Sequence, residues 1–140
     1  MPVNIAGYAH IRLTVTDIAR SRAFYEAVFG LHVALEVPED ADEDTRDQLA
    51  FLYGGVIYAV PGGLLGLRPV APDADGFDEN RTGLDHLSFR VEGQAALDEA
   101  VAVLDELGVA HEAVKDIGAG KILEFRDPDG IALELFASNE

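Results

Sequence analysis

The stretches AHIRLTV at residues 9–15 and DHLSFRV at residues 85–91 decide the fold of this chain. In both, a histidine opens a run in which apolar and polar residues alternate, and this alternation predicts a strand with one face on a core. His10 and His86 belong to the polar face of these strands. The chain is therefore predicted to contain two copies of one structural unit, each opened by such a strand.

A helical pattern that stops at a glycine follows each of these strands. The first helix is predicted from about Ile18 to Phe29, with Asp17 as its N-cap and Gly30 as its stop. The second is predicted from about Ala95 to Leu107, with its apolar residues spaced for one face and Gly108 as its stop. The repeat thus extends beyond the opening strand.

Each copy continues with three further short strands. In the first copy they are predicted at Leu49–Tyr53, Val56–Val60 and Leu64–Leu67, separated by glycines and a proline. In the second they are predicted at Ala110–Val114, Ile122–Arg126 and Ile131–Phe136, the last two joined by the turn Asp127-Pro128-Asp129-Gly130. The fold class is therefore α+β, with two tandem βαβββ modules.

The predicted boundaries give one domain over residues 1–140. The first module covers residues 8–70, a linker rich in proline, glycine and aspartate covers residues 71–82, and the second module covers residues 83–137. An acidic run from Glu36 to Asp47 is predicted as a solvated loop.

Composition excludes several classes of function. The chain is 49% hydrophobic and 26% charged, which is typical of a globular protein, and it has no cysteine, so any metal must be held by nitrogen and oxygen. A net charge of −16 repels nucleic acids and anionic membranes.

The uncharged stretch Leu49–Leu67 is broken by glycines and a proline, which favours short strands over a membrane helix. An N-terminus without a basic start and an apolar stretch favours a cytoplasmic location.

The sequence resembles the vicinal oxygen chelate superfamily, which includes glyoxalase I, extradiol dioxygenases, methylmalonyl-CoA epimerase, fosfomycin-resistance transferases and bleomycin-resistance proteins. The resemblance runs from Tyr8 to Ala137 and is most specific in GLDHLSFRV at residues 83–91, LGV at 107–109 and FRDPDGIALEL at 125–135. It implies that the two modules form an open, eight-stranded, barrel-like sheet around a central cavity. It also implies a homodimer.

The resemblance further implies that His10, His86 and Glu134 hold one divalent metal ion. The residues support this set, because Glu134 is a lone carboxylate between Ala132 and Phe136 on one face of the last predicted strand. Two imidazoles and a carboxylate suit iron, manganese, nickel, cobalt or zinc and leave positions open for a chelating substrate. Taken singly, each histidine is more often a satisfied core residue, and the joint pattern favours the metal.

Three residues are predicted to take part in chemistry: Glu134, Arg12 and Arg90. Arg12 and Arg90 share strand faces with the two histidines, so each guanidinium is placed to clamp a carboxylate, phosphonate or enolate oxygen. The alternative for the arginines is a salt bridge to Glu124, Glu134 or another nearby acidic residue. His32 and His111 are predicted to be surface or structural residues.

Four aromatic residues of the predicted strands have two interpretations. They either line one wall of a substrate pocket or belong to the core, which is the commoner place for aromatic residues on strands: Phe51, Tyr53, Tyr58 and Phe136.

These residues predict a metal-dependent enzyme whose small-molecule substrate chelates the ion through neighbouring oxygens, by lyase, isomerase, dioxygenase or transferase chemistry. The alternative is a non-catalytic protein of the bleomycin-resistance type that sequesters a cationic antibiotic. The repeat aligns Gly66 with Glu134, and glycine has no donor atom. Since glyoxalase I uses a fourth protein ligand from the first module near this strand, the chain is not predicted to be a typical glyoxalase I.

Overall fold

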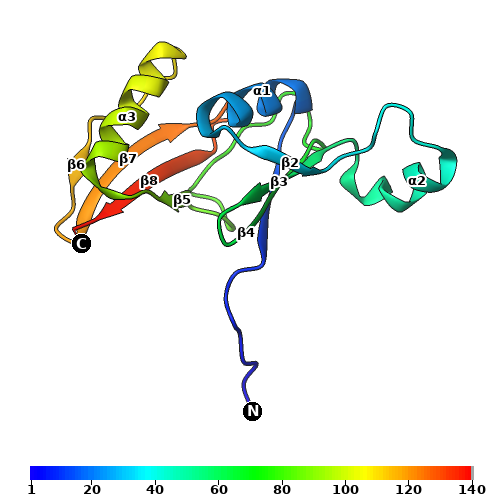
Figure 1. The fold of residues 1–140 in the computed structure, drawn as a ribbon, viewed down its shortest axis with the longest axis horizontal. Coiled ribbons are helices and arrows are strands. Elements are labelled where there is room, and N and C mark those ends of the chain that lie inside the picture. Colours follow the sequence, from blue (N-terminus) through cyan, green and yellow to red (C-terminus); the bar gives the residue numbers. More distant parts are fainter. Residues whose placement is uncertain (140) are drawn as a thin grey trace. The chain divides into compact units, whose positions relative to one another are not determined.

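The computed structural model describes residues 1–139. Contacts divide the chain into two compact units, Met1–Ala74 and Asp75–Glu140, and their boundary falls inside the predicted linker. Each unit contains one four-stranded mixed sheet and at least one helix (Figure 1). The α+β class and the two tandem modules are confirmed, and the eight strands form two separate sheets of four.

The first unit has seven elements. In chain order they are β1 (His10–Thr14), α1 (Ile18–Phe29), β2 (His32–Leu35), α2 (Glu43–Gln48), the 3-10 helix η1 (Ala50–Leu52), β3 (Val56–Val60) and β4 (Gly63–Arg68). The strand order in its sheet is β1-β4-β3-β2, with β1 parallel to β4 and the other neighbours antiparallel.

The second unit has five elements. They are β5 (Leu87–Arg90), α3 (Gly93–Glu106), β6 (Lys115–Asp116), β7 (Gly120–Arg126) and β8 (Ala132–Ser138). The strand order is β5-β8-β7-β6, with β5 parallel to β8, and α3 packs against β7 and β8 (Figure 1). The two sheets therefore have the same topology.

Helix α1 begins and ends where its capping residues predict. The Asp17 side chain accepts a hydrogen bond from the backbone N–H of Arg20 at 3.0 Å. Gly30 adopts a left-handed conformation with φ 61°, and its N–H donates to the carbonyl oxygen of Glu26. The local sequence is sufficient here because both caps act within one turn of the helix.

The predicted strand at Leu49–Tyr53 is wrong. The segment forms η1, with Leu52 fully buried and Tyr53 in a left-handed conformation at its end. The strand that completes the first sheet is β2, which pairs with β3. A short apolar run fits a strand or a packed turn by pattern alone, and the burial of Leu52 favours the turn.

The acidic run from Glu36 to Asp47 is only partly a loop, since α2 begins within it. Asp42 caps this helix by accepting from the backbone N–H of Thr45 at 2.8 Å. Glu43 and Asp44 lie in its first turn, where negative charge is stabilised by the helix dipole.

The second unit departs from prediction at two points. The predicted strand Ala110–Val114 makes only one isolated bridge, between His111 and Phe125, and the paired strand is β6 further along the chain. His86 lies immediately before β5 rather than within it. The first difference replaces a whole predicted strand, whereas the second concerns a strand end, where the pairing partner decides the boundary.

One face of each sheet is buried and the other is open. In the first unit the alternate residues Leu13, Leu65 and Leu67 are buried, whereas His10 and Arg12 are exposed. In the second unit Leu133 and Leu135 of β8 are buried, and Glu134 lies between them on the opposite face. The predicted site residues His10, Arg12 and Glu134 therefore belong to the open faces. No helix of residues 1–139 has the length and apolar character that crossing a bilayer requires.

Candidate functional site

The second unit brings His86 and Glu134 together on the open face of its sheet. Strands β5 and β8 are parallel neighbours, and Ser88 pairs with Glu134 across them. The Nε2 atom of His86 lies 3.6 Å from Oε2 of Glu134. The Glu134 side chain is 16% exposed and that of His86 is 44% exposed, so both remain accessible from the open face.

A second residue orients each member of this pair. Nδ1 of His86 lies 2.6 Å from Oδ1 of Asp85, and Ser88 Oγ donates to Oε1 of Glu134 at 2.7 Å. The hydrogen bond to Asp85 is the main reason that the pKa of His86 is raised above its usual value, with further contributions from the charges of Glu134 and Glu124. These contacts engage Nδ1 of His86 and Oε1 of Glu134, and the remaining atoms Nε2 of His86 and Oε2 of Glu134 lie 3.6 Å apart.

This donor arrangement fits a divalent metal. Nitrogen and oxygen ligands bind such ions at roughly 2.0–2.2 Å, so two ligands of one ion lie about 2.8–3.6 Å apart, the shorter values at octahedral and the longer at tetrahedral angles. The observed 3.6 Å needs only a small side-chain adjustment. A histidine whose Nδ1–H is held by a carboxylate is also the usual form of a metal-ligating imidazole.

The supporting residues Asp85 and Ser88 were missed from the sequence. Asp85 could have been found from its place directly before His86, whereas Ser88 is separated from Glu134 by 46 residues and becomes its partner only through strand register. Glu134 is also not a lone carboxylate, because Glu124 on β7 pairs directly with it across the sheet.

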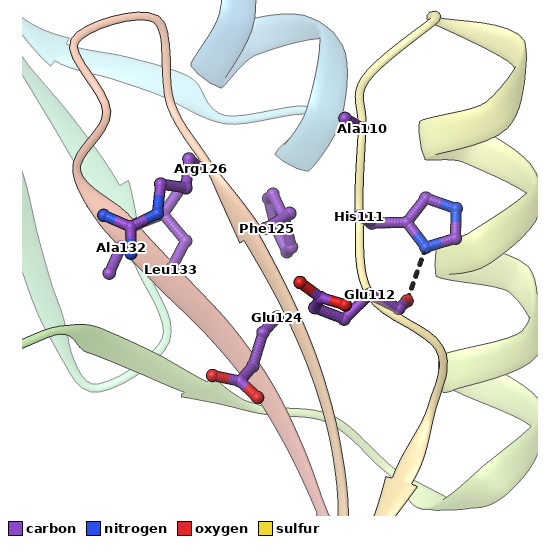
Figure 2. A pocket seen from close by; sticks show the side chains of 8 residues that line it. All are labelled: Ala110, His111, Glu112, Glu124, Phe125, Arg126, Ala132 and Leu133. Carbon is purple, nitrogen blue, oxygen red and sulfur yellow. Dashed lines mark hydrogen bonds between the residues drawn. The ribbon is translucent and has the colours of Figure 1, made fainter.

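The second unit also contains a pocket of about 340 Å3, whose lining includes neither His86 nor Glu134 (Figure 2). Its polar lining includes Glu112, Glu124 and Arg126. Arg126 is paired with Glu79 at 2.6 Å, and this contact lowers the pKa of Glu79 to about 2. Two glutamates, Glu112 and Glu124, therefore share this lining with Arg126 and His111.

His111 has a structural role at the edge of this pocket. Its ring points toward α3 (Figure 2), where Nε2 lies 2.7 Å from Oδ1 of Asp105, while Nδ1 lies 2.7 Å from the carbonyl oxygen of Glu112. Both partners are acceptors, so the doubly protonated ring satisfies both, and the pKa of His111 is raised. The charged imidazole thereby ties the segment after α3 to that helix.

His10 and Arg12 lie together in the first unit. They line a pocket of about 230 Å3 whose other walls are mostly apolar: Ile11, Phe51, Ile57, Leu64 and Gly66. Arg12 pairs with Gly66 across β1 and β4, and its side-chain stem fills the space that a side chain at Gly66 would occupy. Its Nη2 donates to the carbonyl oxygen of Phe51 at 2.6 Å.

Arg90 is exposed on the face of the second sheet that carries Ser88 and Glu134, and its cross-strand partner is Phe136. Neither Arg12 nor Arg90 has a salt bridge to Glu124 or Glu134 in the described structure. Tyr58 and Tyr53, which the sequence places either in a pocket wall or in the core, differ in environment. Tyr58 is fully buried, whereas Tyr53 is exposed.

Within the described residues, no group of three histidine, aspartate or glutamate side chains is arranged to hold an ion. The structure brings together His86 and Glu134 in the second unit and places His10 in the pocket of the first.

The sequence of residues 7–135 matches the Glyoxalase/Bleomycin resistance protein/Dioxygenase superfamily. This chain belongs to that superfamily. The match covers both modules, so the resemblance of the motifs around His86 and Glu134 is confirmed at the level of the family.

Proteins with similar sequences or structures come from several bacteria. The uncharacterised protein YaeR of Escherichia coli (strain K12) is 33% identical over 91% of this chain and 92% of its own length. A glyoxylase/bleomycin resistance protein/dioxygenase domain from Frankia sp. EAN1pec is 31% identical, with a TM-score of 0.77 over 98% of this chain and 95% of that one. The fosfomycin resistance protein FosX from Listeria monocytogenes, in complex with Mn(II) and a sulfate ion, shares the fold at 20% identity, with a TM-score of 0.69 over 97% of this chain and 93% of that one.

Proposed function

We propose that this superfamily member is a metal-dependent enzyme that acts on a small molecule bearing neighbouring oxygens. His10, His86 and Glu134 are the proposed ligands of one divalent ion. The observation that carries the proposal is the pair formed by His86 Nε2 and Glu134 Oε2 at 3.6 Å, each oriented by its own hydrogen-bonding partner. The Mn(II) bound by FosX is consistent with a divalent ion of this class.

When bound, the ion would supply Lewis-acid stabilisation of negative charge on the substrate oxygens. The protein's own contribution is positional. Asp85 and Ser88 hold the two ligands of the second unit in place, and the Arg12 and Arg90 guanidiniums are proposed to orient an anionic group of the substrate. Glu134 is proposed to take part in the chemistry from its place as a ligand of the ion, where the hydrogen bond from Ser88 to Oε1 holds its carboxylate.

The position related to Glu134 by the repeat supports three protein ligands rather than four. The registers of the two sheets match, since Arg12 pairs with Gly66 and Ser88 pairs with Glu134. Gly66 has no donor atom, and the stem of Arg12 occupies the adjacent space. We therefore expect negligible glyoxalase I turnover and exchangeable positions on the ion.

Metal analysis of protein purified without chelator tests the proposal. We expect about one divalent ion per chain, and we expect His10→Ala, His86→Ala and Glu134→Ala to abolish tight binding, because two remaining donors hold an ion weakly. His32→Ala is a matched control for loss of an exposed histidine and retains the metal. Near-native occupancy in all three ligand variants would overturn the assignment.

A second function is favoured by the two glutamates in the pocket of the second unit and by the charge of the chain. Glu112 and Glu124 line this pocket, and the chain carries a net charge of −16, which suits sequestration of a cationic drug. Metal content distinguishes the two functions: the sequestering protein binds bleomycin after chelator treatment and needs no ion, whereas the enzyme requires it.

A further inference from the structure

The open face of the first sheet carries positive charge that the chain does not neutralise. Arg12 on β1 and Arg68 on the neighbouring strand β4 share this face. In the described structure neither guanidinium forms an ion pair, although the chain has 26 acidic residues against 10 basic ones. Other arginines of the chain do form ion pairs, since Arg22 and Arg126 each pair with a glutamate. Two unneutralised cations on one face are therefore unusual for so acidic a chain.

The turn around η1 holds both guanidiniums. Arg12 donates to the carbonyl oxygen of Phe51 at 2.6 Å, and the guanidinium carbon of Arg68 lies 4.3 Å from the centre of the Tyr53 ring. A neutral carbonyl and an aromatic ring orient a guanidinium without cancelling its charge, and they leave most of its N–H donors free. The two cations thus contact positions two residues apart on the same turn.

The backbone at Tyr53 is strained in the conformation that makes this contact. Its φ of 53° lies in the left-handed region, which costs a non-glycine residue on the order of 1 kcal/mol or more. The Tyr53 side chain is also 57% exposed, so burial of the ring does not offset that cost. What the conformation provides is a ring beneath Arg68.

The adjacent pocket is apolar and small. Phe51, Ile57 and Leu64 line it together with Arg12 and His10, and its volume is about 230 Å3. Pockets for drug-sized ligands have volumes of roughly 300–1,000 Å3, so this one accommodates a single ring or a short alkyl chain.

We propose that this face binds a small amphipathic carboxylate, with its oxyanion between Arg12 and Arg68 and its apolar body in the adjacent pocket. This carboxylate would be the substrate class of the proposed function. The link between the two is His10, which is a proposed metal ligand and also lines this pocket. A monoanion suits the site better than a phosphate dianion, because the chain's charge of −16 repels the second negative charge.

A ligand series on chelator-treated wild-type protein tests the site without a metal. Hexanoate is compared by calorimetric titration with hexanamide, which keeps the apolar body without the charge, and with acetate, which keeps the charge without the body. We expect hexanoate to bind at least about tenfold more tightly than either, since each lacks one half of the recognition. Hexanamide or acetate binding within about twofold of hexanoate, or no binding of hexanoate, would overturn the proposal.

Variants then locate the anion. Arg12→Gln and Arg68→Gln are each expected to weaken hexanoate binding about tenfold through loss of a charge-assisted hydrogen bond. Arg20→Gln, on α1, removes the same charge from the same unit and leaves the affinity unchanged. Equal weakening by all three variants would mean that only net charge matters and would refute the assigned site. Circular dichroism checks folding, and the wild-type ligand series remains decisive if a variant does not fold.

Metal uptake measured on the same preparations separates this inference from the proposed function. Selective hexanoate binding by a protein that takes up no divalent ion would support the carboxylate site and overturn the metal site. Uptake of about one ion per chain without any preference for hexanoate would support the metal site and overturn the carboxylate site.

Discussion

Replacing Ser88 with alanine should weaken metal binding without removing a ligand. The Ser88 hydroxyl donates to Oε1 of Glu134 at 2.7 Å, and the Glu134 side chain is only 16% exposed. A hydrogen bond to a charged group contributes about 1.5–3 kcal/mol, which corresponds to roughly 10–150-fold in an equilibrium constant. Loss of a partner that orients a metal ligand typically costs about 10–100-fold in affinity, so both routes give the same range.

Competition with a chromophoric chelator measures this effect directly. Metal-free wild-type protein and Ser88→Ala are titrated with Mn(II) or Zn(II) in the presence of the chelator, and we expect the variant's affinity to be 10–100-fold lower. Ser138→Ala is the matched control, because Ser138 is an exposed serine on β8. It should bind the ion as the wild type does, and thermal unfolding of both variants verifies the fold.

Two results would refute this reasoning. If Ser88→Ala binds within about twofold of Ser138→Ala while Glu134→Ala loses the metal, the hydrogen bond from Ser88 does not orient the ligand. If both Ser88→Ala and Glu134→Ala keep wild-type affinity, Glu134 is not a ligand at all.

Three further predictions concern stability. Tyr58→Phe should lower the free energy of unfolding by about 1–2 kcal/mol near neutral pH, because this fully buried hydroxyl donates to Glu26 at 2.7 Å. This hydrogen bond lowers the pKa of Glu26, so its contribution to the free energy of unfolding is present above about pH 4.5 and is lost as pH falls through the lowered pKa. If urea denaturation shows Tyr58→Phe to be as destabilising at about pH 2 as near neutral pH, the reasoning is contradicted. His111→Gln should show the opposite pH dependence, because the pKa of His111 is raised. The contribution of His111 to the free energy of unfolding is therefore complete below about pH 6.5 and is lost as pH rises through the raised pKa. Equal destabilisation by His111→Gln at about pH 5.5 and about pH 9 would count against this. Gly55→Ala should destabilise by about 3 kcal/mol or more, because the new methyl group would overlap the carbonyl oxygen of Leu67, and a near-unchanged melting temperature would show that the backbone accommodates it.

Local sequence was sufficient wherever a structural feature is satisfied within a few residues. Asp17 and Gly30 set the ends of α1 through hydrogen bonds inside single helical turns. The turn before β8 is likewise local, because the Asp127 carboxylate accepts from the backbone N–H groups of Asp129 and Ile131. Alternation along β8 also predicted that Glu134 faces away from Leu133 and Leu135, since side chains of a strand point alternately to its two faces.

Tertiary structure alone decided the features that depend on a distant partner. The apolar run Leu49–Tyr53 fits a strand when it is considered in isolation. In the structure it forms the 3-10 helix η1, in which Leu52 is completely buried. The hydrogen bond between Ser88 and Glu134, like the stem of Arg12 beside Gly66, follows from the register of two parallel strands. Register is determined by burying one whole face of each strand at once, and the single residues that it brings together therefore carry no signal in the sequence near them.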